Sequence, residues 1–255
     1  MIPDGAPRGT LTLHGRVLPA SNATFVGDVD GVSVVYKPVR GERPLWDFPG
    51  ATLAHREVAS YLVSEALGWR VVPTTWLGEG PHGAGMLQVW MESEPDVSPV
   101  DVVEAGTVPP GYLHVLDALD AHDRPVALVH EDSAALRRMA LFDAVVNNAD
   151  RKGGHVLAMP GGHRHGVDHG LTFHVEPKLR TVLWGWAGDP ISDSEAAALE
   201  ALLADLESDL GDHLSTLVES AEVEETCARV RGLLAGSAFP FPPDTGYPLI
   251  PWPPF

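Results

Sequence analysis

The sequence predicts an α+β fold with a small, β-rich N-terminal half and a mostly helical C-terminal half. Short β-rich runs broken by turn signals fill residues 10–37, and an acidic, turn-rich stretch at 94–112 separates them from the helical periodicity that follows. A chain of 255 residues buries about three-quarters of its unfolded surface. One large domain or two intimate lobes are therefore expected.

Composition excludes several classes of protein. The mean hydropathy is near zero with 44% hydrophobic residues, which is typical of an ordinary globular chain. A formal charge of −18 argues against a nucleic-acid partner or an anionic membrane surface. Cys227 is the single cysteine, so neither a disulfide framework nor a cysteine zinc site is expected. The first ten residues, MIPDGAPRGT, lack a signal-peptide pattern, and no uncharged apolar run is long enough to span a membrane, which predicts a cytoplasmic protein without a membrane anchor.

The β-rich half is predicted in order along the chain. Asp30-Gly31 lies between alternating runs and predicts a hairpin within three antiparallel strands, the last at Val32–Lys37. Residues 52–67 have the apolar spacing of an amphipathic helix, which Gly68 ends. The segments VVPTTWLGEG and GAGMLQVWME then predict a further pair of strands.

The second half carries helix signals and one hairpin. Residues 132–148 predict a helix with Asp132 as its N-cap, and residues 156–168 predict a hairpin. Ser192 and Glu195 form a capping-box pattern before a long acidic helix, and another helix is expected over 221–235. The tail at 239–255 alternates prolines with aromatic residues, so packing along the body is favoured, and a partner-binding role stays open.

Two further motifs are less informative than their spacing first suggests. Gly78, Gly80 and Gly83 match the dinucleotide-binding glycine pattern, but no helix follows them, so a hairpin turn is the better interpretation. Five histidines between residues 155 and 174 suggest a dedicated metal cluster. The proline–glycine turn at 160–162 beside them is typical of a solvated loop, which makes that cluster the less favoured alternative.

Three features in a fixed order carry the chemistry. Lys37 ends a strand, Glu57 lies on the next predicted helix, and the polar loop NNADRKGGHV at 147–156 is followed by a hairpin and Asp168. Phosphoryl transfer requires these residue types: a lysine for the nucleotide phosphates, an acid that holds it, an acid near the attacking hydroxyl and oxygen ligands for a metal. Each feature is weak alone, and their joint order carries the prediction.

Across residues 10–190 the chain resembles the phosphatidylinositol 3-/4-kinase-like branch of the protein-kinase superfamily. The likeness is to type II phosphatidylinositol 4-kinases, to toxin kinases of the HipA type and, more closely, to an actinobacterial PI3/4-kinase-like family. Asn148-Ala149-Asp150-Arg151 and His165-Gly166-Val167-Asp168-His169-Gly170 match the family's catalytic loop and metal-binding motif. The resemblance implies a two-lobed kinase-like fold with an N-lobe at 1–93, a C-lobe at 94–238 and a tail at 239–255.

The resemblance also implies roles for single residues. Lys37 binds the phosphates of ATP and Glu57 orients it. Asp150 is the base or orienter beside the acceptor hydroxyl, and Asp168 holds the metal. Arg151 either neutralises the transferring phosphoryl group or pins the loop. The remaining nucleotide contacts come from a phosphate loop of Ser21, Asn22 and Thr24 and from a hinge at Leu87, Gln88 and Val89.

One position departs from the family pattern. His155 stands five residues after Asp150, where the family has a metal-binding asparagine. Mg²⁺ prefers oxygen ligands, whereas imidazole suits softer divalent ions. The alternatives are use of Mn²⁺, one metal held mainly by Asp168, or a nucleotide-binding pseudokinase without turnover. An active phosphotransferase is favoured over the pseudokinase, with AMP transfer as a further alternative.

The acceptor is expected to be a hydroxyl of a protein, peptide or small molecule. No basic patch, cationic amphipathic helix or lipidation motif supports work on an inositol lipid. Trp184 and Trp186 alternate on a run predicted to be extended, where they either face an acceptor or, as favoured, pack in the core.

Overall fold

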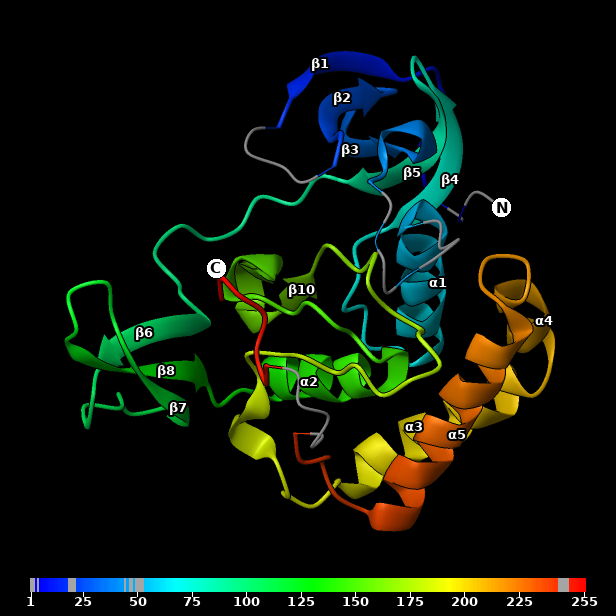
Figure 1. Cartoon of the computed structure of the whole chain (residues 1–255). Coiled ribbons are helices and arrows are strands. Elements are labelled where there is room, and N and C mark those ends of the chain that lie inside the picture. The colour runs from blue at the N-terminus through cyan, green and yellow to red at the C-terminus, as the bar shows by residue number, and fades with distance from the viewer. Residues whose placement is uncertain are drawn as a thin grey trace.

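The computed structural model describes residues 3, 5–17, 22–43, 45, 48, 53–242 and 248–255. Its N-terminal part is a five-stranded antiparallel sheet in the order β1-β2-β3-β5-β4 (Figure 1). The strands are β1 (Thr12–Arg16), β2 (Phe25–Val29), β3 (Val32–Pro38), β4 (Thr75–Gly80) and β5 (Gly83–Val89). The three predicted strands and the following pair are confirmed. Gly80 pairs with Gly83 across the β4–β5 turn, so the glycine pattern is a hairpin.

Side-chain alternation along β3 separates the core from the cleft. Val34 and Tyr36 are fully buried and pack with Trp76 and Leu87. Because neighbouring residues of a strand point to opposite faces, Val35 and Lys37 share the other face. The strand thereby aims its lysine away from the hydrophobic core.

Helix α1 (Leu53–Ala66) follows the first three strands and confirms the helix predicted at 52–67. Its first turn is capped from a distance, because both carboxylate oxygens of Glu42 accept hydrogen bonds at 2.9 Å from the backbone N–H groups of Leu53 and Ala54. The chain leaves the helix at Gly68, whose φ of 68° suits a glycine. The helix contacts β4 and β5 on one side and α2, α3 and α4 on the other.

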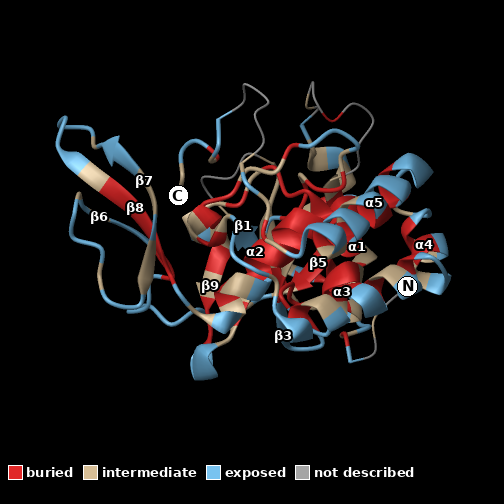
Figure 2. Cartoon of the chain, turned by 90° about the horizontal axis from the view of Figure 1, so that it is seen from below, coloured by how far each residue is buried: buried red, intermediate tan, exposed pale blue. Residues whose placement is uncertain are grey.

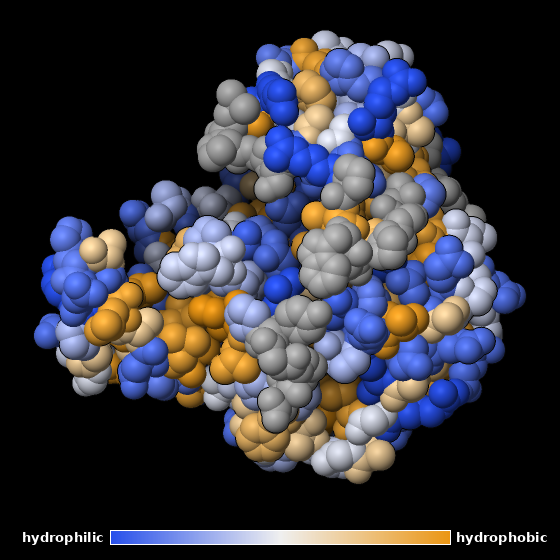
Figure 3. Space-filling model, viewed as in Figure 1, coloured by the Kyte–Doolittle hydropathy of each residue, from blue (hydrophilic) through white to orange (hydrophobic). Residues whose placement is uncertain are grey.

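A second antiparallel sheet lies where a linker was expected. Its order is β6-β8-β7, with β6 (Val100–Glu104), β7 (Tyr112–Leu119) and β8 (Pro125–Glu131). The stretch 94–112, predicted to be a turn-rich link, thus contains β6, while β7, which begins at its last residue, and β8 were not predicted. The sheet projects from the body at the left of Figure 1. Hydrophobic residues gather where it meets the rest of the chain (Figure 3).

The C-terminal part is mostly helical. It contains α2 (Ala134–Val146), α3 (Asp193–Leu206), α4 (Asp209–Leu214), α5 (Ser220–Gly236) and a hairpin of β9 (Val156–Ala158) and β10 (Arg164–Gly166). Helix α2 is the most deeply buried of these helices in Figure 2. The predicted hairpin, the capping box of Ser192 and Glu195 and the last helix are confirmed.

Two local predictions were wrong. The N-cap of α2 is Ser133, whose side chain accepts from Leu136 N. Asp132 instead accepts a hydrogen bond at 3.1 Å from the indole of Trp186. Trp184 and Trp186 form a 3₁₀ turn rather than an extended run, and both are buried, so the favoured packing role is the one the structure supports.

The described tail packs in part on the body. Phe239 and Pro251 are buried, whereas Phe241 and Trp252 are exposed. The carbonyl of Pro254 accepts a hydrogen bond at 2.8 Å from Gly153 N. Residues 243–247 of the predicted tail lie outside the described residues.

The predicted α+β class is confirmed, with an antiparallel sheet in the N-terminal part and helices dominating the C-terminal part. Within the described residues, none of the helices is both long enough and apolar enough to cross a bilayer.

Candidate functional site

Two adjoining cavities lie between the N-terminal sheet and the C-terminal part. The first, here the linker cavity, has a volume of about 570 Å³. The second, here the ionic cavity, has a volume of about 350 Å³. Lys37 and Asp168 line both, so the two cavities meet at this pair.

The linker cavity has apolar walls and a polar end. Its aliphatic lining comes from both sides of the cleft, with Val35 of β3 and Val89 of β5 on one side and Leu157 and Val167 on the other. The chain that leaves β5, from Trp90 to Ser93, forms a further wall. This combination suits a flat apolar group with a charged extension toward Lys37.

The ionic cavity gathers charged side chains. Its lining includes the cations Lys37, Arg43 and Lys152 and the carboxylates of Glu42, Glu57, Asp150 and Asp168. Within a chain of net charge −18, this cavity has nearly balanced charge.

Lys37 is the centre of the ionic cavity. Its Nζ lies 2.6 Å from Glu57 Oε1 and also bonds Asp168 Oδ1. Glu57 is 3% exposed, whereas the Asp168 side chain is 53% exposed and faces the cavity. Burial favours the neutral form of Lys37, but the carboxylates of Asp168 and Glu57 outweigh it and raise the pKa of the lysine. Lys37 is therefore a fixed cation.

The two carboxylates differ electrostatically. Burial raises the pKa of Glu57, although the neighbouring Lys37 opposes that shift. The Lys37 ammonium holds the pKa of Asp168 well below its usual range. Asp168 also has a φ of 64°, in the left-handed region that few non-glycine residues adopt. Such backbone conformations concentrate at functional sites.

The loop after α2 delivers Asp150 to the same cavity. Helix α2 ends at Asn147, which has left-handed geometry and whose side-chain amide donates to the carbonyls of His174 and Glu176. Asn148 Oδ1 then accepts from Asp150 N at 3.0 Å. The Asp150 carboxylate lies 3.5 Å from Lys152 Nζ. Burial raises the pKa of Asp150, and Lys152 offsets part of that shift.

His155 lies close to Asp168. Its Nδ1 is 2.9 Å from the carbonyl oxygen of Asp150, which can only accept, so Nδ1 carries the proton. Its Nε2 is then an acceptor and lies 3.5 Å from Asp168 Oδ2. Burial lowers the pKa of His155 to about 4, against the attraction of Asp168. A neutral imidazole fixed through its other nitrogen is the usual state of a metal-binding histidine.

Arg151 does not face either cavity. Its guanidinium is fully buried and donates to both oxygens of Asp143 at 2.8 Å. It also contacts His169 Nε2 at 2.6 Å and the carbonyls of His155 and Val167 at 3.3 Å. Of the two alternatives for Arg151, this arrangement favours pinning the loop.

The predicted nucleotide-contact residues are placed unevenly. Ser21 lies outside the described residues. Thr24 lines the linker cavity and Asn22 the ionic cavity, where Asn22 Oδ1 accepts from Arg43 N at 2.9 Å. Gln88 and Val89 line the linker cavity.

The hinge region continues beyond the residues predicted for it. The Gln88 amide donates to Thr75 Oγ1, and Val89 N donates to Thr74 O, both at 2.9 Å. The side-chain amide of Gln88 and the backbone N–H of Val89 therefore already have acceptors within the protein. Sequence reasoning missed the next residues, Met91–Ser93, which line the cavity where β5 has ended. Their position directly after the predicted hinge strand was the available signal.

Sequence reasoning also missed Glu42, Arg43 and Asp143. Glu42 and Arg43 lie in an irregular segment between β3 and α1, and no motif marks them. Asp143 is an acidic residue in the middle of an apolar helix, which is a signal for a buried partner.

Metal-ligating residues are few. Within the part of the chain that the structure describes, no group of three or more His, Cys, Asp and Glu side chains is arranged to hold a metal. The Asp168 carboxylate and His155 Nε2 lie 3.5 Å apart, and this pair of donor atoms is compatible with ions that take one or two protein ligands together with substrate phosphates.

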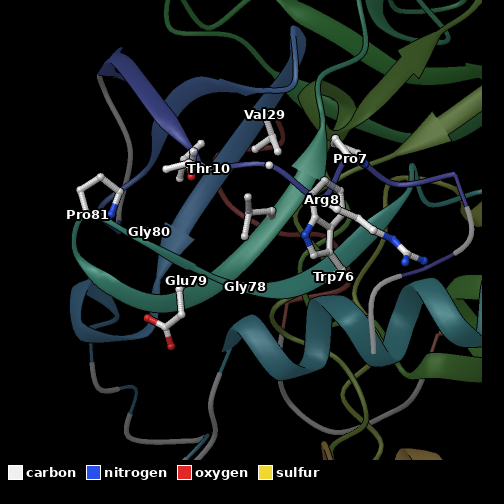
Figure 4. A pocket seen from close by; sticks show the side chains of 12 residues that line it. Pro7, Arg8, Thr10, Val29, Trp76, Gly78, Glu79, Gly80 and Pro81 are labelled. Atoms are coloured by element: carbon white, nitrogen blue, oxygen red, sulfur yellow. The ribbon is translucent and has the colours of Figure 1, made fainter.

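A further cavity of about 550 Å³ lies away from this cleft, against β4 and the segment Pro7–Leu11. Figure 4 shows Arg8 and Glu79 pointing away from it, so its interior offers few charged groups. The charged chemistry belongs to the cleft.

The protein is thus an α+β chain whose cleft holds a lysine–carboxylate cluster beside an apolar cavity. The chain is 48% identical over 260 residues to Protein Rv2133c of Mycobacterium tuberculosis, covering 97% of this chain and 93% of that protein. The chain therefore belongs to the family of Protein Rv2133c.

No family model matches the chain. The crystal structure of the Helicobacter pylori proinflammatory kinase CtkA aligns with 89% of this chain and 97% of its own length, at 10% identity and a TM-score of 0.39. A TM-score of that size establishes neither a shared fold nor a shared activity.

Proposed function

We propose that the protein is an ATP-dependent phosphotransferase of the PI3/4-kinase-like type, acting on a hydroxyl of a protein or small molecule. One observation carries the proposal. Lys37 is paired with both Glu57 and Asp168, in a cavity that also contains Asp150 and adjoins an apolar cavity. A strand lysine paired with a helix glutamate is the arrangement that kinases use to hold nucleotide phosphates.

The linker cavity suits the nucleoside. Its volume of about 570 Å³ lies within the usual range for small-molecule sites. Adenine would lie between Val35 and Leu157, with backbone groups of Met91–Ser93 along its edge. The phosphates would then extend toward Lys37, where the two cavities meet.

The ionic cavity suits the transfer step. Lys37 stabilises negative charge on the phosphates, and Asp150 orients the acceptor hydroxyl and accepts its proton. The raised pKa of Asp150 favours that acceptor role. Lys152, 3.5 Å from Asp150, keeps a cation beside the reacting oxygens.

Asp168 and His155 would hold a divalent metal, which would neutralise charge on the phosphates. The Nε2 atom of His155 is a nitrogen donor in a place where a kinase supplies oxygen. We therefore expect Mn²⁺ to serve better than Mg²⁺.

A nucleotide-binding pseudokinase is the second candidate, and the imidazole of His155 beside Asp168 is the observation that favours it. Both candidates bind ATP in the cleft, and they differ in turnover.

The test is an ATP titration with Mn²⁺, Mg²⁺ or a chelator, followed by thermal unfolding and by assays for ADP and pyrophosphate. ADP formation supports the phosphotransferase, pyrophosphate indicates AMP transfer, and binding without either product supports the pseudokinase. Lys37→Met should reduce the thermal shift at a given ATP concentration, while Arg8→Met, which removes an exposed charge outside the cleft, should retain the full shift. Absence of ATP binding with every metal would contradict both candidates.

A further inference from the structure

We propose that the buried ion pair between Arg56 of α1 and Glu222 of α5 is a latch that positions Glu57 against Lys37. The inference rests on the proposed function and deepens it by assigning two positioning residues far from Lys37 in the sequence. The latch is the Arg56–Glu222 pair, and Thr172 and Ser60 connect it to the ionic cavity.

The ion pair is short and shielded from water. Arg56 Nη2 lies 2.6 Å from Glu222 Oε1, with 7% and 8% of the side chains exposed. The other terminal nitrogen of Arg56 donates to the carbonyl of Thr172. Glu222 is itself fixed, because its Oε2 accepts from Glu219 N at 3.0 Å in the capping box of α5. Helix α5 therefore presents a rigid carboxylate to α1.

Hydrogen bonds continue from the latch to the ionic cavity. Thr172 Oγ1 donates to the carbonyl of His169 at 2.8 Å and lies 3.2 Å from Ser60 Oγ. His169 N in turn donates to Glu57 Oε2 at 3.1 Å. The second oxygen of Glu57 bonds Lys37. These contacts form a continuous path from α5 to the lysine, and all of the residues along it except Lys37 are buried.

The position of the latch on α1 explains how it acts. Arg56 and Ser60 are four residues apart and share one face of the helix, whereas Glu57 points to β3. A rotation or shift of α1 would break the contacts of Arg56 and Glu57 together. The latch therefore holds α1 in the position that pairs Glu57 with Lys37.

Energetics agree with a positioning role. Burying two charges is costly, and well-packed apolar residues often replace such a pair without loss of stability. What an apolar pair would not reproduce is the directional contact of Arg56 with both Glu222 and Thr172. The pair consequently specifies geometry more than it adds stability.

The decisive variant is Glu222→Gln, which keeps the side-chain size and removes the charge. We expect a roughly tenfold loss of Mn²⁺–ATP affinity by calorimetry. We also expect the two substitutions to be non-additive. The double variant Lys37→Met/Glu222→Gln should bind ATP as weakly as Lys37→Met alone, and no more weakly.

Glu131→Gln is the matched control. Glu131 forms a buried pair with Arg164 at 2.8 Å, with 12% and 9% of the side chains exposed, and lies outside the cleft. The Glu131→Gln variant should lower the unfolding temperature as Glu222→Gln does, because each breaks a buried ion pair. Its ATP affinity should stay within about twofold of wild type, and its effect on binding should add to that of Lys37→Met.

A milder pair covers the case in which Glu222→Gln does not fold. Thr172→Val removes the hydroxyl that bonds His169 and should weaken ATP binding, whereas Thr172→Ser retains the hydroxyl and should restore it. Wild-type affinity in Thr172→Val would overturn the latch, and so would additive or wild-type behaviour in a folded Glu222→Gln.

Hydrogen exchange separates this inference from the proposed function. Without nucleotide, amides of α1 should exchange faster in Glu222→Gln, or in Thr172→Val if the former does not fold, and remain protected in Glu131→Gln. Faster α1 exchange in a protein whose wild type binds no ATP would support the latch and overturn the nucleotide site. Unchanged α1 exchange overturns the latch whether or not ATP binds.

Discussion

Two ionic clusters contact the loop 148–155, and their exposure to solvent differs. In the cleft cluster, Lys37 bonds Glu57 and Asp168, and the Asp168 side chain is 53% exposed. In the interior cluster, Arg151 bonds Asp143, and both side chains are 0% exposed. The cleft cluster lines a cavity that can hold a ligand, whereas the interior cluster is completely surrounded by protein.

The comparison shows why adjacent residues of one motif differ in role. Asp150 and Arg151 are neighbours in sequence, but Asp150 lines the ionic cavity while Arg151 ties the loop to α2. The interior cluster holds the backbone from which Asp150 and His155 project. Chemistry is thus expected from the cleft cluster and stability from the interior one.

Asp143→Ala should have the largest effect, on stability. It leaves the buried Arg151 guanidinium without a counter-charge, which typically costs about 3–5 kcal/mol. Urea unfolding of Asp143→Ala beside Asp150→Ala measures the difference. The partly buried and longer pair of Asp150 with Lys152, at 3.5 Å, should change stability by no more than about 1 kcal/mol. Equal losses in the two variants would remove the distinction between the clusters.

Lys37→Met should have the next largest effect, on ATP binding. Losing a charged contact to the phosphates should reduce ATP affinity about 10- to 100-fold. Calorimetry measures the affinity of the folded variant. Urea unfolding should show a loss of stability, because the buried Glu57 carboxylate loses its cation, but a smaller loss than in Asp143→Ala, because Asp168, the other partner of Lys37, is 53% exposed. A variant that binds ATP normally would contradict the assignment of the cleft cluster.

His155→Asn sharpens the metal assignment. Replacing the nitrogen donor with an amide oxygen should raise activity or ATP affinity with Mg²⁺ relative to Mn²⁺ by about tenfold. His165→Asn is the control, since His165 bonds the carbonyl of Val71 and does not line either cavity. An unchanged metal preference in His155→Asn would exclude His155 as a ligand.

His130→Gln should have the smallest effect and tests burial outside both clusters. Burial lowers the pKa of His130, whose Nε2 accepts from Gly185 N at 3.0 Å. Below a pH of about 6.5 the imidazole therefore binds a proton more readily in the unfolded chain than in the folded chain. The free energy of unfolding is unaffected by this difference above that pH and decreases as the pH falls below it.

Glutamine can keep the acceptor without titrating, so the stability lost between pH 7.5 and 5.5 should shrink by up to about 1 kcal/mol. Thermal unfolding at both pH values measures it. An identical loss in His130→Gln and wild type would show that His130 does not contribute.

Local signals predicted most of the fold. Asp30-Gly31, Gly68 and the capping box at Ser192 act over a few residues, and the structure has the expected element at each. The β6-β8-β7 sheet was missed because Val100 pairs with His130, thirty positions along the chain. Its stability depends on that long-range pairing and on packing, which short-range patterns do not report.

The clustering of the candidate site residues was predicted in outline. The order of Lys37, Glu57, Asp150 and Asp168 was sufficient to propose one cleft, and all four line the ionic cavity. The roles of Arg151, Gln88 and Val89 depend on where each side chain or N–H already has a partner. Sequence spacing places such groups near a site but does not show whether they are free.

The nearly balanced charge of the ionic cavity has a consequence for how fast an anion enters it. The whole chain carries −18, so at low ionic strength a nucleotide meets long-range repulsion before it reaches the cations Lys37, Arg43 and Lys152. Raising the salt from 0.01 to 0.15 M shortens the Debye length from about 30 to about 8 Å and screens that repulsion more than the short contacts. Association of ATP should therefore accelerate with added salt, the reverse of what a basic cleft on a neutral protein would show.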